Sequence, residues 1–167
     1  WTACSRDGYH HAYLQRLGDE AVWIKDGRKA ASGPLRSLAT AGRQGRYLAK
    51  AEISRDGRRL AFVRRIFSEE GGHRGYAVEI NGKLGRLYSQ VDELTFSPDG
   101  SRLAYWATTS GGERVVGEGE AGPLLAFGSS RGLFLTEAGT SPTWPVPRDS
   151  SSSTWITSPS ATGHGAP

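Results

Sequence analysis

One pentapeptide of the chain, Gly128-Ser129-Ser130-Arg131-Gly132, matches the G-x-S-x-G nucleophile elbow. That motif activates its serine only where a strand turns sharply into a helix above an α/β sheet. Here the preceding residues form a pattern of short strands, and the segment itself is rich in glycine. We therefore interpret it as a loop and assign no catalytic residue to the chain.

Four side chains able to bind a metal ion fall within eight residues of one another: Cys4, Asp7, His10 and His11. Adjacent histidines on a strand point to opposite faces, which makes it awkward for both to reach one ion. Asp7 also belongs to a recurring turn. We interpret the segment as a turn followed by a strand and predict neither a metal site nor a cofactor.

Three aspartates recur in the same local sequence: Asp7, Asp56 and Asp99. Carboxylates that recur in this way could bind calcium or act as acid/base pairs. Each, however, lies two residues after a serine and directly before a glycine, and this pattern is typical of a tight turn. We predict a structural role for all three and expect the turns to lie well apart. The glycines concerned are Gly8, Gly57 and Gly100.

The turns belong to a repeated strand–turn–strand unit, seen best in residues 94–107, LTFSPDGSRLAYWA. Pro98 presets φ, Asp99 bonds its own backbone, and Gly100 closes the hairpin, after which an apolar strand follows. Weaker copies lie at residues 53–63 and 5–14. In each copy a second turn follows a second apolar run, and the clearest example is Asn81-Gly82.

The repeats recur at roughly 40–50 residues, the period of a propeller blade, and no long run has helical periodicity. The segment FSPDGSRLAYWA, followed by a VV-x-x-G run and Gly122-Pro123, resembles the WD40-like PD40 repeat of TolB-type β-propellers. The resemblance covers residues from about 5 to 127. It implies an all-β fold of about three four-stranded antiparallel blades at residues 5–53, 54–96 and 97–139. We expect residues 1–139 to be propeller repeats and residues 140–167, rich in Ser, Thr and Pro, to be a flexible tail.

Three blades are fewer than the four to eight of a typical propeller. Together with the absence of Met among the 167 residues, this favours a processed or truncated piece of a larger protein. An arc closed by self-association is the alternative. We expect the outer faces around Tyr13, Trp23, Leu124 and Phe127 to lack a neighbouring blade, so the isolated chain should associate through its end blades or fold poorly.

Two segments are less regular. Residues 28–50, with Gly33-Pro34, should form strand or irregular structure at the outer part of the first blade. Residues 68–73 should form an exposed hairpin loop. Cys4 follows Thr-Ala, as in a lipoprotein signal, but no apolar region precedes it, so we interpret it as a small buried or partly exposed thiol.

The net charge is +4, and arginines gather between Arg43 and Arg74. Because no nucleic-acid motif accompanies them, we interpret them as solvated surface rather than a nucleic-acid interface. No stretch is apolar enough to span a membrane.

The resemblance implies a non-catalytic binding module that offers its loops and rim to a protein partner, at a periplasmic or other extracytoplasmic site. The alternative is the propeller segment of a prolyl-oligopeptidase-like serine peptidase, whose catalytic domain would lie outside this chain.

Overall fold

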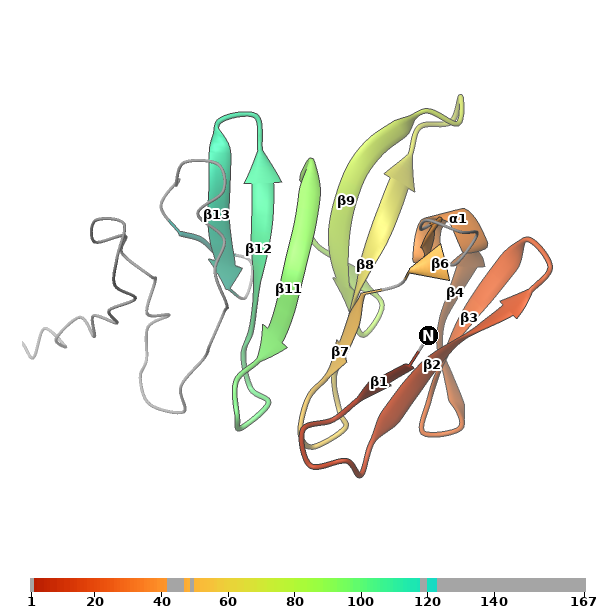
Figure 1. The fold of residues 1–167 in the computed structure, drawn as a ribbon, viewed down its shortest axis with the longest axis vertical. Coiled ribbons are helices and arrows are strands. Elements are labelled where there is room, and N and C mark those ends of the chain that lie inside the picture. Colours follow the sequence, from red (N-terminus) through yellow and green to blue (C-terminus); the bar gives the residue numbers. More distant parts are fainter. Residues whose placement is uncertain (1, 42–46, 49, 118–119, 123–167) are drawn as a thin grey trace, which may run out of the picture.

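Three four-stranded antiparallel sheets form most of the described part of the chain, which in this computed structural model comprises residues 2–41, 47–48, 50–117 and 120–122. Figure 1 shows the sheets side by side, in the order of the sequence. The described residues are therefore mostly β, in agreement with the predicted all-β class. Within the described residues no helix is long and apolar enough to cross a membrane.

In each four-stranded sheet the strands neighbour one another in the order of the sequence. The first sheet contains β1 (Thr2–Cys4), β2 (His11–Leu17), β3 (Glu20–Lys25) and β4 (Arg28–Pro34). The second contains β7 (Ala51–Ile53), β8 (Leu60–Phe67), β9 (His73–Ile80) and β10 (Lys83–Leu84). The third contains β11 (Gln90–Phe96), β12 (Leu103–Thr109), β13 (Gly112–Gly117) and β14 (Glu120–Ala121). A helical turn, α1 (Leu35–Leu38), and a small pair, β5 (Thr40–Ala41) with β6 (Tyr47–Leu48), connect the first sheet to the second.

Two hydrophobic cores lie between the sheets. The first combines residues of the first sheet, α1 and the second sheet, with Trp23, Leu38 and Phe62 among its most deeply buried members. The second joins the opposite face of the second sheet to the third sheet, through residues such as Val78 and Val116. The second sheet is therefore covered on both faces, which explains why its strands are apolar at successive positions rather than at alternate ones.

The first strands of the three sheets lie next to each other. β7 contacts β1 on one side and β11 on the other. The turn after each of these strands occupies the same end of the molecule, at the bottom of Figure 1. The first strands of the three sheets therefore lie along one line, and the turns that follow them lie close together.

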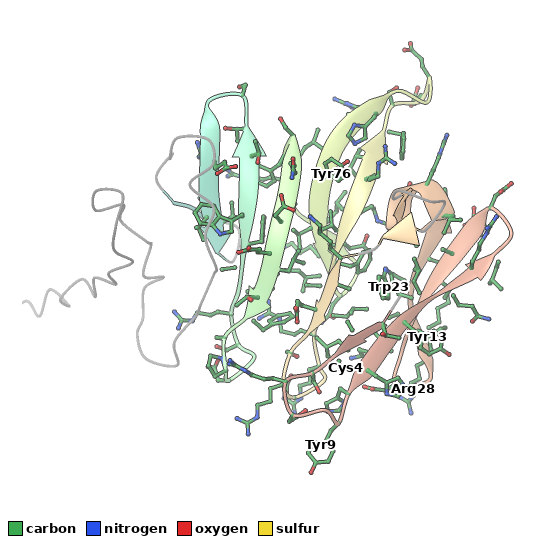
Figure 2. The ribbon with its side chains drawn as sticks, viewed as in Figure 1. Cys4, Tyr9, Tyr13, Trp23, Arg28 and Tyr76 are labelled. Atoms are coloured by element: carbon green, nitrogen blue, oxygen red, sulfur yellow. The ribbon has the colours of Figure 1, made fainter. Side chains whose placement is uncertain are left out.

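Two predictions about the first repeat are wrong. Trp23 does not lie on an uncovered outer face; its side chain is fully buried against the second sheet (Figure 2). It alternates along β3 with Val22 and Ile24, so one face of the strand meets the second sheet and the other carries the partly exposed residues. Residues 35–38, predicted as strand or irregular, form α1, whose Leu35 and Leu38 enter the first core.

The boundaries of the sheets and the positions of three exposed features can also be compared with the predictions. Each sheet begins one strand earlier than the corresponding sequence repeat, because β1, β7 and β11 precede the turns that open the repeats. Residues 68–72 form the expected exposed loop between β8 and β9. Cys4, predicted to be buried or partly exposed, is instead exposed, because alternation along β1 turns Ala3 rather than Cys4 inward. Tyr13 is 37% exposed on the outer face of the first sheet (Figure 2).

Several predictions concern residues outside the described part of the chain. These are the loop at residues 128–132, the outer-face residues Leu124 and Phe127, the end of the third repeat and the tail at residues 140–167.

Candidate binding site at the turn-bearing end

The first repeated turn is a closed network of short hydrogen bonds. The Ser5 hydroxyl donates to Asp7 Oδ1 at 2.6 Å, and the backbone N–H of Tyr9 donates to the same oxygen at 3.1 Å. The N–H of His10 donates to Ser5 Oγ at 3.0 Å. Gly8 has φ +78°, the left-handed conformation that glycine adopts without strain. The sequence therefore specifies this turn locally.

The other two turns repeat the same bonds with different neighbours. Ser54 and Ser97 donate to Asp56 and Asp99 at 2.6 and 2.5 Å, and both serines are buried. Ser101 adds a further hydroxyl bond to Asp99 at 2.7 Å. The glycines that close these turns are Gly57 (φ +67°) and Gly100 (φ +74°).

These bonds set the acidity of the three turn carboxylates. The Ser5 and Ser54 hydroxyls are the main causes that lower the pKa of Asp7 and Asp56. The Ser97 hydroxyl, followed by Ser101, lowers the pKa of Asp99 to about 2. Hydrogen bonds to a carboxylate favour its charged form. The three aspartates are thus anionic at neutral pH, and Oδ1 of each accepts hydrogen bonds within its own turn.

The expectation that the three turns lie well apart is wrong. A Cβ added to Gly57 would lie 2.3 Å from His10 Nδ1, so the His10 ring packs directly on this glycine. A Cβ on Gly100 would lie 3.0 Å from Ser54 Cβ. Arg55 Nε lies 3.9 Å from Asp7 Oδ2. Because the first strands pack together, the turns form one continuous row. We call this row, residues 5–10, 54–59 and 97–102, the turn-bearing end.

The two adjacent histidines also differ from the prediction that they point apart. His10 Nδ1 lies 2.9 Å from Asp26 Oδ2, and His11 Nδ1 lies 3.8 Å from Asp26 Oδ1. His10 precedes β2 and does not share its alternation, so both rings reach one carboxylate. The backbone N–H of His11 is the main cause that lowers the pKa of Asp26. No three His, Cys, Asp or Glu side chains of the described residues are grouped to hold a metal ion.

A cleft of about 570 Å³ opens beside this row, between the first and second sheets. Its cationic lining comes from the β3–β4 hairpin, with Lys25 at the end of β3 and Arg28 and Lys29 at the start of β4. Leu60 and Phe62, both almost fully buried, close its floor. The remaining lining residues are Asp26, Ala30, Asn81 and Gly82.

The far wall of the cleft is the predicted Asn81-Gly82 turn, which connects β9 to β10. Asn81 adopts φ +48°, accepts a hydrogen bond from the Leu60 N–H at 3.0 Å, and donates one to the Arg58 carbonyl at 3.2 Å. Lys25 Nζ donates to the Gly57 carbonyl. These bonds tie both walls of the cleft to the second turn and to the strand that follows it.

The turns could be located from the sequence, but the cations of the cleft could not. The cluster of arginines in the sequence lies between residues 43 and 74, whereas Arg28 and Lys29 lie outside that interval. The signal was present as Lys25-Asp26-Gly27-Arg28-Lys29, a charged hairpin turn. Its significance depends on the second sheet, which supplies the opposite wall.

Comparison with known proteins does not assign this chain to a family. No protein-family model matches it, and a search of curated proteins found no match. The interpretation of the site therefore depends on its own geometry.

Proposed function

We propose that this chain is a segment of a TolB-like β-propeller that acts as a non-catalytic module and binds another protein. The observation that carries the proposal is the contact of β7 with both β1 and β11. Four-stranded meanders whose first strands gather along one line are the arrangement expected of blades around an axis. The resemblance to the PD40 repeat supports the same architecture.

The turn-bearing end has the properties of a binding surface. Loops held on a rigid scaffold are frequent sites of binding. Here the scaffold is the set of first strands, and the turns are stiffened by their serine–aspartate bonds. Tyr9, 84% exposed, projects from the tip of the first turn (Figure 2). Arg55 and Arg58 are also exposed, with side chains 61% and 87% accessible. An exposed tyrosine beside arginines is a combination enriched at protein interfaces.

The polar groups of this end favour binding over catalysis. The turn aspartates accept bonds from their own serines and backbone N–H groups, and Asp26 accepts bonds from His10 and the His11 N–H. A general base needs a free oxygen within reach of the proton it removes. A general base is also most effective when its pKa lies near the working pH. The pKa values of these carboxylates are instead lowered, which supports a structural role for them.

A peptide-display selection on the immobilised chain tests the proposal. We expect enriched peptides that compete with one another and that lose binding when Tyr9 and Arg58 are both replaced by alanine. The matched control replaces Leu84 and Arg74, also exposed but outside the turn-bearing end, and should retain binding. Selection of no peptide, or of peptides equally affected by both variants, would refute a binding role for this end.

A further inference from the structure

The cleft between the first two sheets carries unbalanced positive charge. Arg28 and Lys29 have exposed side chains on one wall, and Lys25 lies at the rim beside them. The acidic residue of the lining, Asp26, is already bonded to His10 and to the His11 N–H. A ligand that enters the cleft therefore meets cations, so the cleft selects for anionic groups.

The cationic wall is also a strand edge. β4 pairs with β3 on one side, and no strand of the described residues pairs with its other side. A bulge between Trp23 and Ile24 leaves Ala30 without a partner on β3. Ala30 lines the cleft. The bulge and the lysine interrupt regular pairing at this edge, as in edge strands that avoid joining another sheet. The cations of the wall, rather than a backbone ladder, therefore select the ligand.

We propose that this cleft binds an extended acidic segment of the protein partner, whose carboxylates pair with Arg28 and Lys29. The proposal rests on the proposed function and deepens it, since it specifies the chemistry of the partner. Arg28 and Lys29 occupy successive residues at the start of β4, and both line the cleft. They would therefore contact carboxylates at different positions of the bound segment.

The cleft is less suited to nucleic acid. Single-stranded nucleic acids gain much of their affinity from bases stacked on exposed aromatic rings. The aromatic ring of the cleft lining, Phe62, is 1% exposed and cannot receive a base. The side-chain amide of Asn81 donates a hydrogen bond to the Arg58 carbonyl. Charge remains as the means of recognition, and without an exposed ring for stacking it favours an acidic peptide over a single-stranded nucleic acid.

Fluorescence anisotropy with three labelled probes tests the proposal on the full chain. The probes are an eight-residue peptide of alternating Glu and Thr, the same peptide with Gln in place of Glu, and an oligothymidylate of eight nucleotides. We expect the Glu peptide to bind more tightly than both others. Replacement of Arg28 and Lys29 by Gln should weaken its binding roughly tenfold, the sum of two partly exposed ion pairs. The control, Arg74→Gln with Arg86→Gln, removes the same charge from exposed sites elsewhere.

Amide chemical-shift mapping on the unmodified chain gives a second, mutation-independent result, and shifts should gather at Ala30, Asn81 and Gly82. Equal weakening in both double variants, preference for oligothymidylate, or shifts elsewhere would overturn the proposal. Failure of this proposal and failure of the proposed function remain distinguishable. Peptides selected at the turn-bearing end, together with a Glu peptide whose binding the Arg28 and Lys29 variant does not weaken, would preserve the binding module and refute the acidic partner. An empty selection would refute the module itself.

Discussion

The rings of Trp23 and Phe62 meet across the first two sheets, with centroids 5.8 Å apart and planes inclined by 35°. Trp23 comes from β3 and Phe62 from β8, and both are almost fully buried. This pair occupies the first core, directly behind the floor of the cationic cleft. The stability of the sheet interface and the shape of the cleft thus depend on the same contact.

Phe62→Ala should lower the free energy of unfolding by about 3–5 kcal/mol, because it removes a buried ring and leaves a cavity against Trp23. Urea unfolding followed by tryptophan fluorescence measures the change. Tyr9→Ala, at an 84% exposed position, is the control and should alter stability by about 0.5 kcal/mol or less. Similar losses in the two variants would contradict the packing described for the first core.

Breaking the ion pair between Arg64 and Glu79 should be costly. Arg64 Nε lies 2.5 Å from Glu79 Oε2, and the two side chains are 18% and 9% exposed. Glu79→Ala leaves the guanidinium largely buried without its carboxylate and should cost about 3–5 kcal/mol. Replacing both residues by leucine should recover most of that loss in thermal or urea unfolding. A double variant that is no more stable than Glu79→Ala would show that the pair itself is not the source of the cost.

Alanine at Gly57 should be more harmful than alanine at Gly27. Both glycines have positive φ, +67° and +75°, so both substitutions carry a strain of about 1 kcal/mol. Gly27 has open space around an added Cβ, whereas at Gly57 the Cβ would overlap the His10 ring. We expect a total of about 3 kcal/mol for Gly57→Ala. Adding His10→Ala should reduce the cost of Gly57→Ala to that at Gly27, and an unchanged cost would refute the contact between the first two turns.

Stability should fall in acid through the turn carboxylates. Their pKa values are lowered in the folded state, and that of Asp99 lies at about 2. A group with a depressed folded pKa contributes stability above its unfolded pKa, near 4, and loses it as pH falls through the folded pKa. The urea midpoint should therefore decline between about pH 4 and pH 2. Asp99→Asn should show a shallower decline, whereas Glu70→Gln, on the exposed loop between β8 and β9, should follow the unmodified chain.

The turns could be predicted from the sequence because their bonds are local. The contacts between sheets could not, because they depend on packing between distant segments. The bonds of Ser97 and Asp99 join residues at most five positions apart, so the sequence alone specifies them. The proximity of Gly57 to His10 depends on how β1 and β7 pack, which no local pattern reports. For the same reason Trp23 was placed on the wrong side, since alternation shows that a strand has two faces but not which one meets the next sheet.

The glycine contacts give the row of turns a direction. His10 of the first turn packs on Gly57 of the second, and Ser54 of the second packs on Gly100 of the third. The first and second turns thus each present a side chain to the glycine of the next turn, while Gly8 has no described atom within 4 Å of an added Cβ. The contacts between successive turns are therefore not symmetric, so the two ends of the row differ. In protein engineering terms, a copy joined ahead of Gly8 must supply a side chain to fill that space, and the repeats are not interchangeable in order.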